Sequence, residues 1–272
     1  MKATKQYRVR PGHKLRWEDV NSGDTGPFDK KEEALDKTEE SIQQIDLLQE
    51  RLFAEGTRGL LIVLQGIDTS GKDGTIRHVM RGLNPQGCRV TSFKEPTPEE
   101  LGHDFLWRVH RHVPAKGVIG IFNRSHYEDV LVTRVHDLIT GREAEKRFRV
   151  INDFERILAE NGTVVVKFFL AISKEEQRRR LQARLDDPQK RWKFSPNDLA
   201  ERGYWDRYMK AYSEAISATS TKRAPWYLIP ANHEWYRNYL VAKIIAATLG
   251  EMDPKYPADR SGIDTRKIVI PN

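Results

Sequence analysis

The stretch with the clearest chemical pattern is GIDTSGKDGT, residues 66–75. Its Gly66, Gly71 and Lys72 fit the pattern G-x-x-x-x-G-K-[ST], in which backbone N–H groups cradle phosphates, the lysine reaches the outer phosphates and a hydroxyl holds Mg²⁺. The residue after the lysine is Asp73, so the hydroxyl of the pattern is missing. The pattern predicts a phosphate-binding loop; the alternative is an ordinary strand-turn-helix connection. The missing hydroxyl raises the question of what would hold a metal ion.

A second group of polar residues follows the apolar run GVIGIF, residues 117–122. In a parallel sheet the carboxyl ends of the strands form the ligand crevice, so we expect Arg124 to point at phosphates. Oxygen ligands suit Mg²⁺, and we expect Glu128 and Asp129, with Asp68 inside the loop, to supply them. The alternative for each carboxylate taken alone is a solvated charge at a helix end.

A third group is the segment KEEQRRRLQARLDDPQKRWK, residues 174–193, which has eight basic residues and four acidic ones. Arg180 and Arg184 are four residues apart and would share one face of a helix. Small-nucleotide kinases carry a mobile lid in this part of the chain, and we predict a lid over about residues 174–205. The alternative is a solvated charged helix. The histidines, His126 among them, are too scattered to predict a metal site.

The elements that must position these groups can be read from apolar runs. Five short runs are rich in β-branched and apolar residues and alternate with helix-patterned segments, which predicts a parallel α/β sheet of about five buried strands flanked by helices. The alternative for any single run is a turn of buried helix. The predicted strands are residues 60–65, 89–93, 117–122, 163–170 and 225–231.

Helix signals lie between the predicted strands. A long amphipathic helix is predicted over residues 32–56, and a helix should follow the loop over residues 74–83. Residues 173–185 open with a capping box, Ser173 followed by Glu176, and a further helix should begin with a proline after Ser195. The first thirty residues and the tail from Asp253 are rich in Gly, Pro and charge, and we expect them to be extended. These helix and loop predictions rest on the printed sequence.

Length and composition limit the number of domains, the kind of partner and the cellular compartment. The 272 residues suit one domain carrying a lid, spanning residues 1–272, with an N-terminal extension and helix over residues 1–58. A formal net charge of +7 indicates an anionic partner. The single cysteine, Cys88, excludes an intramolecular disulfide and suits a reducing compartment. No apolar run resembles a signal peptide or a membrane span, so we expect a cytoplasmic protein without a membrane partner.

Taken together, the motifs resemble one family. The segments GIDTSGKDGT, SFKEPTPEELGHDFLWRVH, FNRSHYEDVLVTRV, RLQARLDDPQKRWKF and WYLIPANHEWYRN are similar to those of the polyphosphate kinase 2 family, and Tyr-Glu-Asp after Asn-Arg-Ser resembles its class III. The resemblance implies a P-loop kinase fold similar to thymidylate kinase, with a helical lid. It also implies Mg²⁺-dependent transfer of phosphoryl groups from inorganic polyphosphate to AMP and ADP, and a homo-oligomer. Mn²⁺ is an alternative metal and guanine nucleotides are alternative acceptors.

The resemblance also implies roles for individual residues. Asp68 and Asp129 match the family's metal-holding carboxylates, so metal binding has moved from the hydroxyl to carboxylates. Relatives that use only ADP have asparagine near the position of Glu128, which implies that Glu128 supports AMP. The residues expected to contact phosphates or polyphosphate are Gly66, Gly71, Lys72, Gly74, Thr75, Arg77, Arg124, Arg180, Arg184, Lys190 and Lys193.

Two other functions remain open at this stage. An ATP-dependent nucleoside monophosphate kinase has the same loop, sheet and lid, but it would need a second nucleotide site. A polyanion or nucleic-acid binder without catalytic activity would fit the basic surplus. Aromatic residues are not interleaved with the basic ones, as a platform for single strands would require, so we expect no nucleic-acid partner.

Overall fold

The computed structural model describes residues 2–258 and 268–271. Five parallel strands form one sheet in the order β2-β3-β1-β4-β5. The strand order places β1, from which the glycine loop emerges, in the centre of the sheet. This confirms the predicted α/β fold, and the two ends of each predicted strand lie within two residues of the observed ends. The strands are β1 Gly59–Gln65, β2 Cys88–Ser92, β3 Ile119–Asn123, β4 Thr163–Ala171 and β5 Trp226–Pro230.

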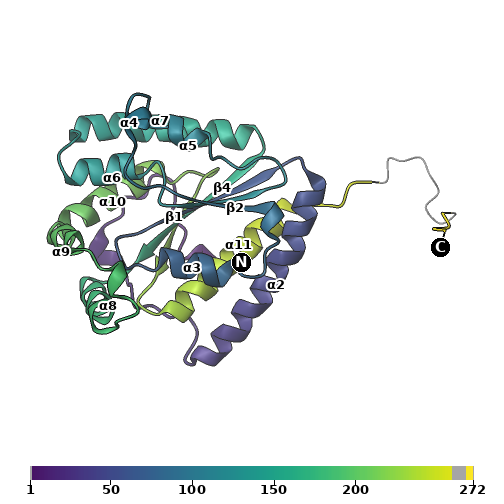
Figure 1. Cartoon of the computed structure of the whole chain (residues 1–272), viewed down its shortest axis with the longest axis horizontal. Coiled ribbons are helices and arrows are strands. Elements are labelled where there is room, and N and C mark those ends of the chain that lie inside the picture. The colour runs from purple at the N-terminus through teal and green to yellow at the C-terminus, as the bar shows by residue number, and fades with distance from the viewer. Residues whose placement is uncertain (1, 259–267, 272) are drawn as a thin grey trace.

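Helices cover both faces of the sheet (Figure 1). The helices α2, α3 and α11 lie on one face, and α6, α7 and α10 lie on the other. The longer helices are α2 Lys31–Glu55, α3 Lys72–Val79, α6 Glu128–Val135, α7 Gly141–Glu160, α8 Lys174–Asp186, α9 Pro196–Gly203, α10 Trp205–Thr219 and α11 Glu234–Met252. The short turns of helix are α1 Lys2–Lys5, η1 Trp17–Asp19, η2 Pro85–Gly87, α4 Pro98–Leu101, α5 Trp107–His110 and η3 Arg191–Lys193.

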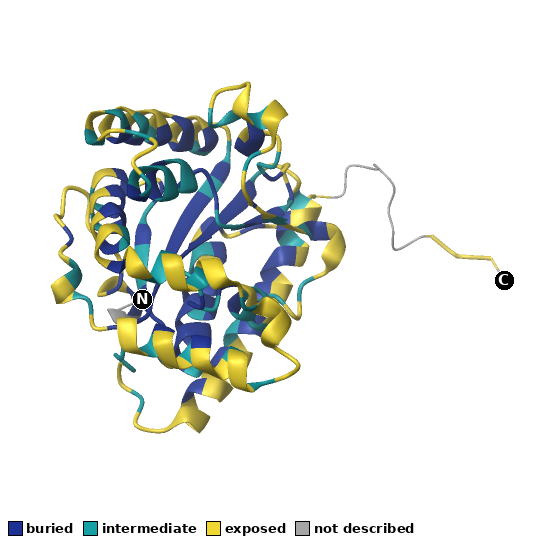
Figure 2. Cartoon of the chain, turned by 60° about the vertical axis from the view of Figure 1, so that its left-hand side comes forward, coloured by how far each residue is buried: buried dark blue, intermediate teal, exposed yellow. Residues whose placement is uncertain are grey.

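The burial pattern explains why the sheet forms. Every residue of β1 is buried, as expected for a central parallel strand covered by helices on both faces. Along α2 the residues Ile42, Ile45, Leu48 and Leu52 recur three or four positions apart and are buried. Figure 2 shows the strands and the inward helix faces buried and the outward faces exposed. The core therefore lies between the sheet and its two helical layers.

Several predicted helix ends are confirmed. The long helix α2 ends where Gly56 adopts a left-handed conformation with φ 62°. Helix α9 begins at Pro196 behind the cap Ser195. The predicted capping box of α8 is half formed, because Ser173 accepts from the N–H of Glu176 while the Glu176 carboxylate binds arginines instead.

The N-terminal segment has little regular structure beyond α1 and η1, as predicted, but it is not detached. The N–H of Val9 donates to the carbonyl of Trp226, and the N–H of Leu228 donates to the carbonyl of Tyr7. Through these hydrogen bonds the N-terminal segment covers the outer edge of β5. Residues 253–258 contain no helix or strand, whereas the rest of the predicted extended tail falls partly on residues 259–267, outside the described residues.

Candidate phosphate-binding site

The glycine loop, residues 66–71, joins the end of β1 to the start of α3. Its backbone turns through unusual conformations, with φ of 155° at Gly66 and 96° at Gly71. A Cβ on Gly66 would lie 2.6 Å from the Ser70 hydroxyl oxygen. No side chain caps α3, so the N–H groups of its first turn face the loop. Such an uncapped N-terminus next to a glycine loop suits an anion.

Lys72 is the buried cation of the loop. Its ammonium donates to the carbonyls of Gly66 at 2.6 Å and Ile67 at 3.3 Å. Desolvation is the main cause that lowers the pKa of Lys72, to about 8, and the charge of Arg124 acts in the same direction. Lys72 is therefore folded back on its own loop.

The end of β3 places a second cation beside the loop. Arg124 has φ 61°, its N–H donates to the carbonyl of Leu64, and its guanidinium donates to Asp68 Oδ1 at 2.9 Å. Desolvation opposes the charge of Arg124, but the carboxylates of Glu128 and Asp68 outweigh it, so the pKa of Arg124 is raised. The left-handed backbone at Arg124 turns its side chain toward the loop.

Glu128 is at the start of α6 and completes this group. Gln65 donates to Glu128 Oε1 at 3.1 Å. Burial raises the pKa of Glu128, while Arg124 and Lys72 lower it. We call Asp68, Lys72, Arg124 and Glu128 the loop cluster, because each of these charges acts on the others.

Asp129 has a different environment from the loop cluster. Its Oδ2 lies 3.6 Å from Nη2 of the buried Arg108 and is a buried atom that accepts no hydrogen bond. Burial raises the pKa of Asp129, and the charges of Arg108 and Arg147 oppose this effect. Within residues 2–258 and 268–271 no three His, Cys, Asp or Glu side chains are grouped closely enough to hold a metal ion. The three predicted metal-binding carboxylates are therefore not drawn together around one point.

One central cavity nevertheless connects the start of the glycine loop with Arg124, Glu128 and Asp129. It has a volume of about 760 Å³ and is lined by the loop, the ends of β2 and β3, the lid and α10. Phe93, Trp205, Tyr208 and Tyr212 give it an aromatic wall. The predicted site residues that line it are Gly66, Asp68, Arg124, Glu128, Asp129, Arg184 and Lys193.

The four predicted lid cations have different surroundings. Arg184 and Lys193 line the cavity, and Arg184 is 3.7 Å from Asp198. Lys190 lies outside the cavity lining, is exposed and pairs with Asp187 at 2.8 Å. Arg180 also lies outside it, with Nη1 donating to the carbonyl of Thr69 at 2.9 Å. Arg180 thus links helix α8 to the glycine loop.

Gly71 and Lys72 do not line the cavity, and three further residues of α3 that were predicted to bind phosphate also lie outside its lining. Gly74 packs near Arg237, and a Cβ there would be 3.4 Å from its Nη2. Thr75 is buried and donates its hydroxyl to the carbonyl of Gly71. Arg77 is exposed on the helix surface. Their backbone positions support the loop, but their side chains are not directed into the cavity.

Sequence reasoning missed several residues of the site. Gln65, the last residue of β1, contacts Glu128, and Arg108 contacts Asp129. Asp73, which had no assigned role, accepts a hydrogen bond from Asn123 at 2.6 Å. A search for polar residues at strand ends would have found Gln65, because it ends an otherwise apolar strand. No sequence signal indicates the Arg108 contact.

The oxygen atoms of the site suit a divalent metal. Carboxylates are the ligands that hard cations prefer, and the buried Oδ2 of Asp129 has no hydrogen-bond donor. The buried hydroxyls of Thr69 and Ser70 in the loop also lack hydrogen-bond partners. Phosphotransferases of this fold use a divalent metal. The chemistry of these oxygen donors therefore suits such an ion, although the carboxylates do not converge on one point.

The strand order, the glycine loop after β1 and the helical lid after β4 define a P-loop kinase. The chain belongs to the polyphosphate kinase 2 (PPK2) family, whose model matches residues 28–257. It is therefore a phosphotransferase. The family resemblance drawn from the sequence motifs is confirmed.

Individual relatives agree with this assignment. The chain is 52% identical to an AMP/ADP-polyphosphate phosphotransferase of Meiothermus ruber, over 98% of this chain and 99% of that protein. It is 45% identical to an ADP-polyphosphate phosphotransferase of Rhodopseudomonas palustris, over 93% of this chain and 92% of that protein. The crystal structure of polyphosphate kinase 2 from Arthrobacter aurescens TC1 superimposes with a TM-score of 0.91 at 45% identity, covering 95% of this chain and 93% of that one.

Within residues 2–258 and 268–271, none of the helices combines the length and apolar character needed to cross a bilayer.

Proposed function

We propose that this protein transfers phosphoryl groups from inorganic polyphosphate to AMP and ADP, giving ADP and ATP. The observation that carries the proposal is the central cavity, which joins the glycine loop and Arg124 to the lid cations Arg184 and Lys193. The names of the relatives from Meiothermus ruber and Rhodopseudomonas palustris support the same donor and acceptors.

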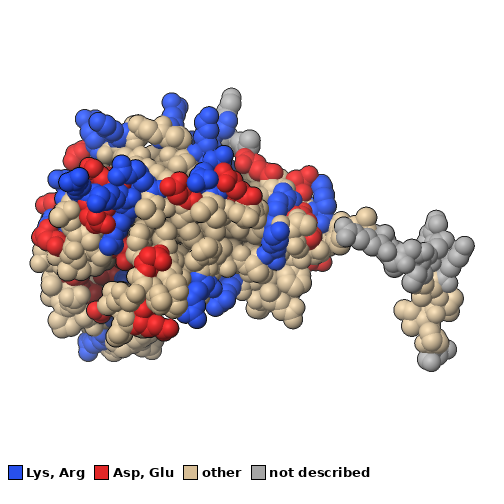
Figure 3. All heavy atoms as spheres, turned by 90° about the horizontal axis from the view of Figure 1, so that it is seen from above, with Lys and Arg blue, Asp and Glu red and all other residues tan. Residues whose placement is uncertain are grey.

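Polyphosphate is a long polyanion without base or sugar, so its binding site needs point charges spaced along a track. Arg184 and Lys193 supply such charges on the lid side of the cavity, and the proposed track continues past Lys190 on the surface. On the face seen in Figure 3, Lys and Arg side chains alternate with Asp and Glu and form no uniform basic surface. This mixed surface gives no support to a general polyanion binder.

The proposed transfer needs positioning and charge neutralisation more than chemical intermediates. A terminal phosphate oxygen of AMP or ADP attacks the end phosphorus of polyphosphate in line. The bond between that phosphorus and the next bridging oxygen breaks, and its electron pair leaves with the shortened chain. Lys72 and Arg124 would neutralise the oxygens of the transferred group. A phosphate dianion carries no proton on the attacking oxygen at neutral pH, so no general base is required.

We propose Mg²⁺ as the metal, with Mn²⁺ as an alternative, held by Asp68 and Asp129, and we propose that Glu128 holds a second metal ion or an ordered water. When bound, the ion would neutralise charge on the phosphate oxygens. Asp68 pairs with Arg124 and Asp129 faces Arg108, so a metal ion would compete with these arginines for the two carboxylates. With the metal bound, the arginines would pair with the phosphates instead.

We propose that residues 1–272 act as one kinase domain with the lid at about 174–205, as a homo-oligomer, in the cytoplasm where AMP and ADP are found. Guanine nucleotides are proposed as further acceptors. Size-exclusion chromatography with light scattering tests the oligomer, and the reaction below tests the acceptors.

The decisive experiment is product analysis by nucleotide chromatography. AMP, ADP, GMP and GDP are each given polyphosphate and Mg²⁺ without ATP. The proposal predicts ADP and ATP from the adenine nucleotides. Turnover that requires ATP would instead favour a nucleoside monophosphate kinase. Tight salt-dependent binding without any product would favour a polyanion binder.

A further inference from the structure

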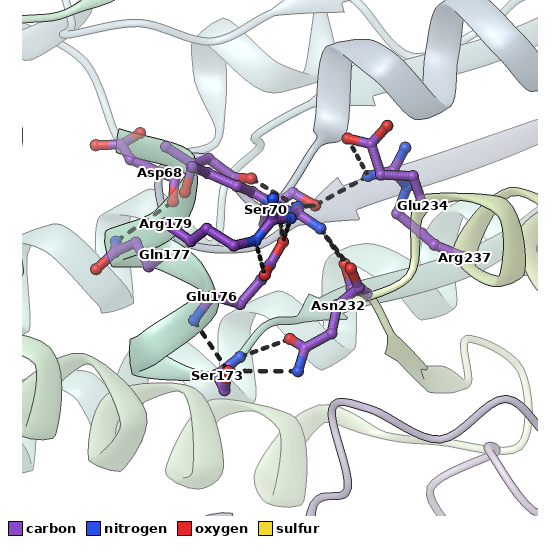
Figure 4. Close-up of polar contacts among 12 residues, drawn as sticks. Asp68, Ser70, Ser173, Glu176, Gln177, Arg179, Asn232, Glu234 and Arg237 are labelled. Carbon is purple, nitrogen blue, oxygen red and sulfur yellow. Dashed lines mark hydrogen bonds and ion pairs between the residues drawn. The ribbon is translucent and has the colours of Figure 1, made fainter. Parts of the chain in front are cut away.

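Arg237, on the first turns of α11, lies directly beneath the glycine loop. Its side chain is almost fully buried, with 2% of the side-chain surface exposed. Nη1 donates to the carbonyl of Ser70 at 3.4 Å, and Nη2 donates to Asn238 Oδ1 at 3.0 Å. Figure 4 shows Arg237 reaching from α11 toward Ser70, with Glu234 beside it. The guanidinium therefore contacts the loop without lining the central cavity.

The packing against the loop is close. A Cβ on Gly71 would lie 1.9 Å from Nη1 of Arg237. Gly71 is the residue immediately before α3, whose first-turn N–H groups are uncapped. Arg237 thus fills the space behind the N–H groups that an anion on the loop would meet.

The positive charge of Arg237 is poorly compensated. Its ion-pair partner among the described residues, Glu234, is 3.9 Å away and its side chain is 70% exposed. Desolvation lowers the pKa of Arg237 to about 10, with Glu234 opposing this effect and Arg180 adding to it. The charge of Arg180 is better compensated, because its Nε donates to the Glu176 carboxylate at 2.6 Å. A buried cation with so weak a partner is costly unless another anion comes near it.

We propose that Arg237 is a positioning residue for the phosphoryl donor. It holds the Ser70–Gly71 turn in shape and adds positive potential behind the N–H groups of the loop, so that donor phosphates provide the missing negative charge. The inference rests on the proposed function, in which the loop binds the donor. No side-chain contact with the donor is implied, since the loop backbone lies between them.

The test measures binding of sodium tripolyphosphate by titration calorimetry, without nucleotide. Arg237→Met keeps the volume and removes the charge, and it should raise the Kd for tripolyphosphate about tenfold or more. In steady-state assays the KM for polyphosphate should rise, whereas the KM for ADP should stay within about twofold. A purely structural role would lower the melting temperature without this selective change in donor binding.

Two further variants make the test sharper. Glu234→Gln removes the exposed partner and should lower the Kd slightly, by less than about threefold, because surface charges are screened. Arg58→Met is the matched control, since Arg58 pairs with Glu55 and donates to the carbonyl of Met252 at the other end of the sheet. Its Kd should equal that of the wild type.

Lys72→Ala separates failure of this inference from failure of the proposed function. If Lys72→Ala binds tripolyphosphate normally, the loop is not the donor site and the proposed function is wrong on this point. If Lys72→Ala loses binding while Arg237→Met keeps wild-type Kd and KM values, only the inference is overturned.

Arg237→Met may be replaced where its melt is not cooperative. Arg237→Gln, which keeps an N–H donor and removes the charge, and Glu234→Gln then decide: weaker binding in the first with tighter binding in the second supports the inference, and wild-type constants in both overturn it.

Discussion

Glu128 offers the sharpest test of acceptor choice. AMP lacks the β-phosphate of ADP, yet in-line transfer fixes where the attacking oxygen must lie. A carboxylate in the loop cluster would compensate for the absent β-phosphate by holding a second metal ion or an ordered water that draws the α-phosphate into place. We predict that Glu128→Asn lowers AMP phosphorylation much more than ADP phosphorylation.

The structure sets the size of the expected effect. Glu128 is half-buried, accepts a hydrogen bond from Gln65 at 3.1 Å and interacts with the charges of Arg124 and Lys72. Losing a charged hydrogen-bonding partner costs about 1.5–3 kcal/mol, which corresponds to a rate loss of about 10- to 150-fold. That loss should fall on AMP, while the rate with ADP should change by less than about fivefold, because its own β-phosphate replaces the charge.

The assay compares initial rates with AMP and with ADP at saturating polyphosphate. Glu128→Gln separates the loss of charge from the shorter side chain of asparagine. Glu175→Gln is the matched control, since Glu175 is an exposed carboxylate on α8 that pairs with Arg178. An unchanged ratio of AMP to ADP rates in Glu128→Asn would refute the role given to Glu128.

Three other outcomes are expected. Lys72→Ala and Asp68→Asn should each lower kcat by about a hundredfold or more with a normal melting curve, whereas Arg77→Ala should be near normal; unfolding or full activity of the first two would contradict their roles. Replacing Lys190 and Lys193 with alanine should raise the KM for long polyphosphate more than for tripolyphosphate, and equal losses would place these lysines outside the track. Since the pKa of Lys72 is about 8, its charged fraction falls as the pH rises through 8, so kcat/KM for polyphosphate should decline there and should not decline in Lys72→Arg.

The sheet could be predicted from the sequence because local and tertiary preferences agree there. The run LLIVL in β1 is apolar at every position, and a strand covered on both faces suits such a short run of β-branched and apolar residues between turn residues. The end of α2 at Gly56 was equally readable, since glycine adopts the left-handed conformation without strain.

The side-chain partners in the site could not be predicted in the same way. Spacing along α8 put Arg180 and Arg184 on one face, yet Arg180 binds the carbonyl of Thr69 and Arg184 lines the cavity. Adjacent carboxylates also separated, with Glu128 in the loop cluster and Asp129 beside Arg108. These choices depend on which elements the sheet brings together, and a helix pattern contains no information about that.

The missing hydroxyl after Lys72 now has a structural explanation. Asp73 accepts a hydrogen bond from Asn123, the last residue of β3, so the first turn of α3 is tied to the neighbouring strand. Asn123 is followed by Arg124, whose guanidinium binds Asp68 in the same loop. The aspartate therefore helps to fix the position of Arg124 relative to the loop, and the proposed metal ligands are the carboxylates that line the cavity.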